Sequence, residues 1–184
     1  MPHLRRNIAS SILLCGLVAG CGAGAPATAP PEPAAASSSA PALPAPGTVA
    51  LTGDLRAQGE LTTASLARLP QRTVTVSYQT GKGPEKRTET GVLLADAVPA
   101  TAFAEAPGKN PALSFAVLGV GADGYTALVA YGEYSPDFGN RGTMIATSED
   151  GKPLERPRLV VPGDRKGGRY VSDLVELKVV RVAR

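Results

Sequence analysis

Cysteine, histidine and tryptophan are nearly missing from this sequence of 184 residues. The only histidine is His3, the only cysteines are Cys15 and Cys21, and there is no tryptophan. Catalytic sites that need a histidine base, and metal sites built from Cys and His ligands, are therefore excluded from the chain after residue 21. A disulfide within that part is excluded too, because a disulfide needs two cysteines.

Aromatic residues are also few, and their distribution marks the part of the chain that packs. The five tyrosines and three phenylalanines all lie between Tyr78 and Tyr170. A hydrophobic share of 43% with 19% charged residues is typical of a globular protein. Loss of Arg5 and Arg6 with a signal peptide would take the formal charge from +3 to +1, which leaves the mature protein nearly neutral.

The first 21 residues are arranged like a bacterial lipoprotein signal. Arg5 and Arg6 precede an apolar, uncharged run over 8–20, which is too short for a permanent membrane span. The run ends in Val-Ala-Gly directly before Cys21 and resembles a lipobox. The resemblance implies cleavage before Cys21 and lipid on its sulfur, and two or three acyl chains anchor a protein stably. The simpler alternative is an ordinary signal peptide that contains a cysteine.

We therefore predict a signal peptide over 1–20 and an extracytoplasmic protein held to the membrane through Cys21. Gly22, rather than aspartate, follows the cysteine. By the habit of lipoproteins this favours the periplasmic face of the outer membrane if the cell is Gram-negative. Nucleic acid is not an expected partner at such a place.

Residues 21–48 are predicted to form a disordered tether. The stretch is rich in alanine and proline and carries one charge, Glu32, so it cannot bury a core. The remaining residues, 49–184, are enough for one domain. We expect three parts: a signal peptide (1–20), a lipidated cysteine with its tether (21–48) and one folded domain (49–184).

The folded part has the pattern of a β-rich α+β domain. Apolar and β-branched residues alternate most clearly over 72–78 and 174–182. The complete set of expected strands is 49–55, 72–78, 86–90, 114–120, 125–131, 143–147, 158–161 and 174–182. Short helices are expected over 64–69, capped by Thr62 or Thr63, and over 92–98. Strands and helices do not alternate regularly, which argues against a parallel α/β fold.

A glycine-rich motif over 119–124 matches the G-x-G-x-x-G pattern of dinucleotide-binding proteins. That function needs the motif between a strand and a helix, where the phosphate meets the helix N-terminus. Here a second strand follows at Tyr125, and Asp123-Gly124 is the signal of a hairpin turn. We therefore predict a β-hairpin at this motif.

Seven segments, taken in chain order, resemble the sulfite-oxidase-type molybdopterin-binding domain. They are Leu61–Leu66 with Leu69-Pro70, the strand Val74–Tyr78, Gly91–Leu94, Asp123-Gly124-Tyr125, Ile145-Ala146 with Asp150–Leu154, Arg158–Gly163, and Arg169-Tyr170-Val171. Together they span about 120 residues. The resemblance implies a mixed α+β fold with a β-rich core, and it makes a molybdopterin cofactor a candidate.

The sequence departs from this family where the family holds its metal. The family's molybdenum-binding cysteine thiolate belongs at or just after the Val-rich strand, but the corresponding stretch, 76–80, has no cysteine. A serine or tyrosine oxygen is a harder and less acidic ligand than a thiolate. The family's histidine near the pterin and its Lys-Trp pair near the last strand are also missing. We therefore expect no metal site and no bound cofactor.

The preferred hypothesis is a ligand-binding or interaction module that keeps this fold without metal catalysis. Its pocket is expected between the strand over 72–78 and the loop over 162–170. The candidate pocket residues are Ser77, Tyr78, Asp123, Tyr125, Arg158, Arg165, Lys166 and Arg169. By the resemblance, the four basic residues would hold an anionic small ligand, as the family's basic residues hold the pterin phosphate. The simpler alternative is that they only solvate a turn.

Two other functions stay open. One is a molybdopterin-dependent periplasmic oxidoreductase, or a subunit of one, with Ser77 or Tyr78 near the metal. The other is an envelope structural protein that binds no small ligand, whereas the preferred module would take an anionic small ligand or an envelope protein as its partner. Whether the protein is an enzyme is therefore undecided from the sequence, although the departures argue against it.

The lipoprotein assignment predicts that Cys21→Ala releases the protein from membranes. The substituted residue has no sulfur to carry lipid, so the protein should move to the soluble fraction when cells are fractionated. Cys15→Ala is the matched control, because Cys15 lies within the signal and is removed with it. Continued sedimentation of the Cys21→Ala variant with membranes would contradict the assignment.

Overall fold

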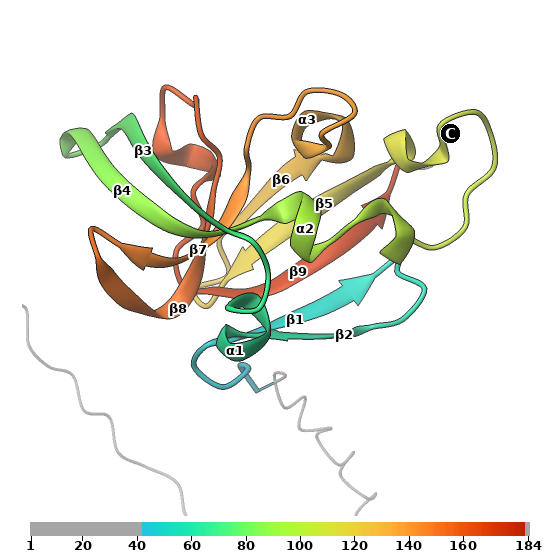
Figure 1. Cartoon of the computed structure of the whole chain (residues 1–184), viewed down its shortest axis with the longest axis horizontal. Coiled ribbons are helices and arrows are strands. Elements are labelled where there is room, and N and C mark those ends of the chain that lie inside the picture. The colour runs from blue at the N-terminus through green and yellow to red at the C-terminus, as the bar shows by residue number, and fades with distance from the viewer. Residues whose placement is uncertain (1–41, 183–184) are drawn as a thin grey trace, which may run out of the picture. The chain divides into compact units, whose positions relative to one another are not determined.

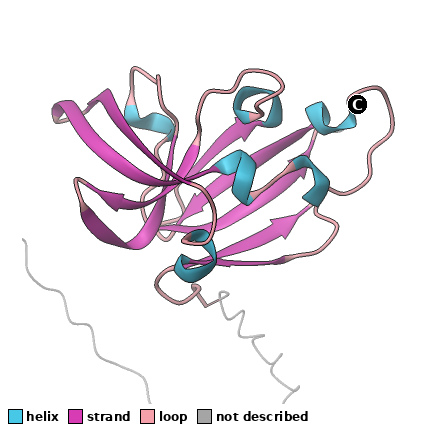
Figure 2. Ribbon diagram, in the orientation of Figure 1, coloured by secondary structure: helices cyan, strands magenta, loops and turns pink. Residues whose placement is uncertain are grey.

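A computed structural model describes residues 42–182, which form two β-sheets joined by short helices (Figures 1 and 2). The predicted signal peptide, Cys21 and the tether up to residue 41 lie outside the described residues. Within residues 42–182, no helix is long and apolar enough to cross a membrane. Near the start of the described part, the Pro44 carbonyl accepts a hydrogen bond of 3.0 Å from Arg156 Nη1.

The first sheet has five strands in the order β2-β1-β9-β5-β6. They are β1 (Thr48–Gly53), β2 (Gly59–Thr62), β5 (Phe115–Gly121), β6 (Thr126–Ala130) and β9 (Leu174–Arg181). The central strand, β9, runs parallel to β1 and antiparallel to β5. Its Leu174, Leu177 and Val179 are completely buried, as expected of a strand with neighbours on both sides.

The second sheet has four antiparallel strands in the order β3-β4-β7-β8. They are β3 (Gln71–Thr80), β4 (Gly83–Leu93), β7 (Met144–Glu149) and β8 (Lys152–Val160). Side chains alternate along β3, so Val76 and Tyr78 are buried while Thr75 and Ser77 are exposed. Figure 1 shows the long β3–β4 hairpin curving away from the first sheet.

Short helices connect the strands. They are α1 (Thr63–Leu66), α2 (Leu94–Ala97) and α3 (Tyr131–Tyr134), with 3₁₀ turns η1 (Ala100–Ala102), η2 (Pro111–Ser114) and η3 (Gly167–Arg169). Thr62 caps α1: its hydroxyl accepts from the Ser65 N–H, and the Ser65 hydroxyl accepts from the Thr62 N–H. This reciprocal pair satisfies two amide groups that the first turn leaves free.

The main hydrophobic core is continuous from the first sheet to the ends of β4, β7 and β8. Val49, Leu66, Leu159 and Leu177 are among its completely buried members. Four of its aromatic side chains form a row in the order Phe115, Phe103, Tyr131 and Tyr134, with neighbouring ring centroids 4.8–5.4 Å apart. A second, smaller cluster lies on the second sheet and contains Val76, Tyr78, Met144, Ala146, Val160 and Tyr170.

The predicted α+β, β-rich fold class is confirmed, and so is the hairpin at the glycine-rich motif, where β5 pairs with β6. Other expectations were wrong. Strand β2 was missed because Gly59 and Glu60 interrupt any hydrophobic pattern. Strand β4 runs over Gly83–Leu93 rather than 86–90, so the helix expected over 92–98 begins only at Leu94. Strand β8 begins at Lys152 rather than at Arg158; it contains two prolines, which an edge strand tolerates.

Gly91 is the residue of β4 that has no room for a side chain, and Gly91→Ala is predicted to destabilise the domain. A Cβ there would lie 2.0 Å from the Ile145 carbonyl oxygen and 2.7 Å from Ala146 Cα. Strand β7 would have to move at the β-bulge between Thr90 and Gly91, at a cost of about 2 kcal/mol or more in the free energy of unfolding.

Gly59→Ala is the matched control, because a Cβ on Gly59 meets nothing within 4 Å. Urea unfolding of both variants measures the difference. Equal stability of the two variants would show that β4 and β7 are not packed as closely at Gly91 as described.

Candidate functional site

An open cleft of about 650 Å³ lies beside the end of β3. It is lined by Tyr78, Gln79, Thr80, Gly81, Glu85, Arg158, Lys166, Gly167, Gly168, Tyr170 and Ser172. The loop over 161–170 forms one wall because it docks on the edge of β3: the Gln79 N–H donates to the Arg165 carbonyl at 2.9 Å, and Gln79 forms a parallel bridge with Lys166. The cleft is thus where the sequence predicted a pocket, between this strand and this loop.

Two stacked tyrosines form the floor of the cleft. The rings of Tyr78 and Tyr170 lie 4.3 Å apart with an angle of 27°, an arrangement that aromatic pairs favour. Gly167 packs directly on Tyr78, since a Cβ there would lie 3.0 Å from Cδ2 of Tyr78. Burial raises the pKa of Tyr170 to about 12, and its hydroxyl has no hydrogen-bond partner within the described part of the chain.

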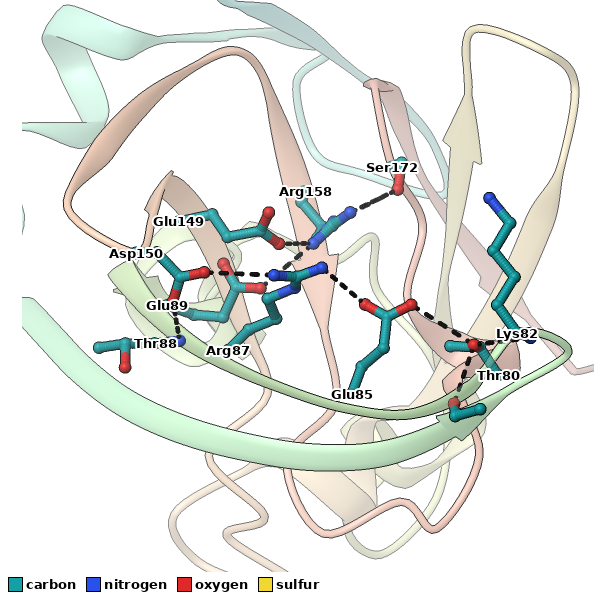
Figure 3. A network of polar contacts seen from close by, with 11 residues as sticks. Thr80, Lys82, Glu85, Arg87, Thr88, Glu89, Glu149, Asp150, Arg158 and Ser172 are labelled. Atoms are coloured by element: carbon teal, nitrogen blue, oxygen red, sulfur yellow. Dashed lines mark hydrogen bonds and ion pairs between the residues drawn. The ribbon is translucent and has the colours of Figure 1, made fainter.

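Arg158 of β8 holds two glutamates behind the cleft (Figure 3). Its Nη1 pairs with Glu89 Oε1 at 3.3 Å and also with Glu149 Oε2. Its Nε and Nη2 donate to Ser172 Oγ at 3.3 and 3.0 Å. The guanidinium group of Arg158 therefore links β4, β7 and β8 to the segment that leads into β9. Arg158 and Ser172, which are bonded to each other, both line the cleft.

Glu89 is the most unusual member of this network, because its side chain is completely buried. It faces Glu149 directly across the β4–β7 pair, where two like charges repel. Its Oε1 is paired with Arg158, but its Oε2 has no hydrogen-bond partner among residues 42–182. Burial is the main cause that raises the pKa of Glu89 to about 6, and Glu149 adds to it, while Arg158 opposes the shift.

A second set of ion pairs runs along the rim, also drawn in Figure 3. Arg87 pairs with Glu85 at 3.0 Å and with Asp150 at 3.5 Å, while Glu85 Oε1 accepts from the Thr80 hydroxyl at 3.4 Å. Arg158 and Lys166 are the two cationic side chains that line the cleft. Arg158 is balanced by two carboxylates, whereas Lys166 has no ion pair with any described residue.

Three of the predicted pocket residues, Tyr78, Arg158 and Lys166, line the cleft together. Tyr125 stands next to it: its hydroxyl donates to the Gly168 carbonyl at 2.6 Å and so fixes one wall. Asp123 stays in the hairpin turn, where Oδ1 accepts the Tyr125 N–H at 2.9 Å.

The other three predicted residues are placed differently. Ser77 is exposed on the outer face of β3, opposite to the face that carries Tyr78. Arg165 is exposed and contributes its carbonyl to the docking of the loop. Arg169 does not line the cleft, because its guanidinium is bound by Asp164 at 2.7 and 2.8 Å and by Glu133 at 2.8 Å. These hydrogen bonds, with that from Asp164 the strongest, raise the pKa of Arg169.

Sequence reasoning missed Glu85, Glu89 and Glu149, along with Tyr170 and Ser172. A signal for the glutamates was present: Glu85-Lys-Arg-Thr-Glu89 places charged residues at every second position of a strand, hence on one face. That this face would point inward depended on the pairing of β4 with β7, which the local pattern does not specify.

Among solved structures, the chain is similar to the sulfane dehydrogenase SoxCD from Paracoccus pantotrophus, with a TM-score of 0.56 and 20% sequence identity. The match covers 72% of this chain and 37% of that chain, so this protein corresponds to little more than a third of it. No family model and no curated protein sequence matches the chain. The likeness concerns the fold, and it confirms the predicted resemblance to the sulfite-oxidase type.

The residues of the cleft do not fit a molybdenum centre, which the family resemblance of the sequence made a candidate. Residues 42–182 contain no cysteine or histidine, and Ser77 points away from the cleft. The ring of Tyr78 is stacked on Tyr170, and burial raises its pKa, which disfavours a phenolate ligand. No group of carboxylates within the described residues could hold a metal ion either. The donor set therefore supports no chemistry on this metal.

The buried position of Glu89 predicts a pH-dependent difference between the protein and its Glu89→Gln variant. Because the folded state raises the pKa of this carboxyl to about 6, it binds the proton more tightly than the unfolded chain, with a pKa of about 4.3. The ionised form thus weakens the fold as pH rises from about 4.3 through 6. Glutamine stays neutral, so the variant should be more stable by about 2 kcal/mol at pH 8 and similar in stability at pH 4.

Urea unfolding at a series of pH values measures this difference. Glu60→Gln, at an exposed position of β2, is the matched control and should show a difference near zero at every pH. A Glu89→Gln variant that is less stable than the unchanged protein at pH 8 would contradict the argument.

Proposed function

We propose that this protein is a membrane-anchored, extracytoplasmic binding module that holds a small organic anion in the cleft beside β3. The domain keeps a fold like that of the sulfane dehydrogenase, but its cleft has no ligands that fit a molybdenum centre. What supports the proposal most is the contrast between the cleft's two cations: Arg158 is neutralised by two glutamates, and Lys166 is free to meet a ligand.

The charge of the cleft favours a ligand with one negative group. The exposed side chain of Lys166 enters the cleft from the docked loop. The hydroxyl of Ser172 already accepts from Arg158, so it can donate its own proton to a ligand oxygen. A monoanion would therefore meet one cation and one hydroxyl, whereas a second negative charge would face Glu85 on the rim.

The floor of the cleft favours a flat apolar part of the ligand. Tyr78 and Tyr170 are 7% and 8% exposed, so their stacked rings offer a thin edge of aromatic surface. Gly167 and Gly168 bring backbone close to these rings without side chains in the way. Aromatic edges and faces pack well against planar groups. An aromatic carboxylate or sulfonate combines one negative group with a flat apolar ring.

The anchor completes the proposal and rests on the sequence. The lipobox-like segment before Cys21 and the Ala/Pro-rich tether would hold the domain near the membrane surface while leaving the cleft accessible. A binding module in that place would collect a ligand outside the cytoplasm or present it to an envelope partner.

Lys166→Gln is predicted to abolish most of the anion binding while the fold stays intact. The experiment follows amide chemical shifts of the full chain during titration with benzenesulfonate and with sulfate at pH 5.5. Shifts are expected at Tyr78 and at the loop over 166–172. The loss of one direct charge should weaken binding by roughly tenfold, the order of a charge-assisted hydrogen bond.

Lys178→Gln is the matched control, because Lys178 is exposed on β9 of the other sheet and should leave both titrations unchanged. If neither anion shifts the cleft residues of the unchanged protein, the binding proposal is wrong and a purely structural role becomes the better explanation.

A molybdopterin-dependent oxidoreductase, or a subunit of one, is the second candidate, and the fold likeness to the sulfane dehydrogenase is the observation that favours it. Elemental analysis decides between the two. The full chain, exported in a host that makes the cofactor, is expected to contain no molybdenum after purification. Near-stoichiometric molybdenum would contradict the binding module and favour the molybdopterin-dependent oxidoreductase.

A further inference from the structure

We infer that Glu89, Arg158 and Glu149 couple the cleft to protons, so that the domain binds its anion more tightly in acidic surroundings than in alkaline ones. This inference rests on the proposed function, because it concerns the regulation of the same site. Three features carry it: the pairing of the two glutamates, the position of Arg158 between them and the cleft, and the burial of Glu89.

The first feature is an excess of negative charge that the fold builds in. Glu89 and Glu149 are directly opposite each other on β4 and β7, and one guanidinium nitrogen, Nη1 of Arg158, serves both. With both carboxylates ionised the three groups carry a net charge of −1, and with one carboxylate protonated they carry none. Repulsion between the carboxylates favours the second state.

The second feature is the short path from this cluster to the cleft. Arg158 and its hydrogen-bond acceptor Ser172 both line the cleft. Burial is the main cause that raises the pKa of both stacked tyrosines, and the charges of the cluster act on them as well. Glu89 and Glu149 raise the pKa of Tyr78, Glu89 raises that of Tyr170, and Arg158 lowers both. An anion placed on this floor experiences the same charges, so a net −1 opposes its binding.

The third feature is that Glu89 is the member prepared to take up the proton. Its side chain is completely buried, and Oε2 has no partner within residues 42–182. The groups that face it are Arg158 on β8, Glu149 on β7, Tyr78 on β3 and Tyr170 in the docked loop, with Arg87 and Glu85 on the same face of β4. Arg158 is the cationic group that pairs directly with Glu89, and Glu149 shares it.

Neutral Glu89 changes what Arg158 can offer. When the carboxylate is ionised, Nη1 is paired with two negative partners, so the positive charge of the guanidinium is outweighed and the cluster presents a net charge of −1 to the cleft. When Glu89 is protonated, Arg158 is balanced by Glu149 alone. Binding of an anion and binding of the proton then favour each other, and by thermodynamic linkage each raises the affinity for the other by the same factor.

The test measures the affinity of the full chain for benzenesulfonate at pH 5 and at pH 8. This probe stays fully ionised over the range, so a change in affinity belongs to the protein. We expect binding to be roughly fivefold tighter at pH 5, the order expected of one unit charge acting through a partly solvated interior. Glu89→Gln should bind equally at both pH values, with the affinity that the unchanged protein has at pH 5.

Glu60→Gln is the matched control and should keep the full pH dependence. Carbon-13 chemical shifts of the glutamate carboxyl groups in the unchanged protein report the protonation of Glu89 independently of any variant. The pH midpoint of the Glu89 titration should rise when benzenesulfonate is added. Equal affinity at pH 5 and pH 8, or a pH dependence that survives in Glu89→Gln, overturns this inference and leaves the binding module in place. Absence of binding at both pH values overturns both.

Discussion

The arrangement of the second sheet depends on one guanidinium group. Arg158 pairs with two glutamates that face each other across β4 and β7, and it bonds to a serine in the segment that leads into the central strand of the other sheet. Without this cation, two carboxylates would be held together in a largely buried place, and each would lack its main compensation. Charged groups in such surroundings are stable only as a set.

The cleft follows from how a loop closes on this sheet. The segment over 161–170 has backbone contacts with the edge of β3, and it brings Tyr170 onto Tyr78 at a point where Gly167 leaves room. Arg169, bound to Asp164 and Glu133, and Tyr125, bound to the Gly168 carbonyl, hold the same loop from its other side. The loop is therefore firmly positioned, and Lys166 projects from it without an ion-pair partner among the described residues. The proposed selection of a small ligand rests on this combination of a fixed wall and one unpaired charge.

The place of the pocket was an expectation from the family resemblance, whereas the fold class and most strands were predicted from alternation, turns and capping residues. Thr62 and the Asp123-Gly124 turn are such local signals, and both were identified. The individual roles of the basic residues could not be predicted, because a charge has meaning only beside its neighbours. Arg158, Lys166 and Arg169 look alike in the sequence, yet two of them are paired with carboxylates. Arg158 meets Glu89 and Glu149 of the neighbouring strands, whereas Arg169 meets Asp164 of its own loop and Glu133 of α3. Glu89 was missed for the same reason: its burial depends on which face of β4 meets β7.

The central position of β9 has a consequence for the order in which this domain is made. Thr52 on β1 bonds to Glu176 on β9, 124 residues farther along the chain, and β9 also pairs with β5. During synthesis the first sheet therefore has a gap at its middle until the last described strand emerges. Strands β1 and β5 have no direct pairing to close that gap. Such long-range pairing is slow compared with local contacts. The first sheet would consequently stay incomplete, and its strands able to be threaded through a narrow passage, until β9 has been synthesised.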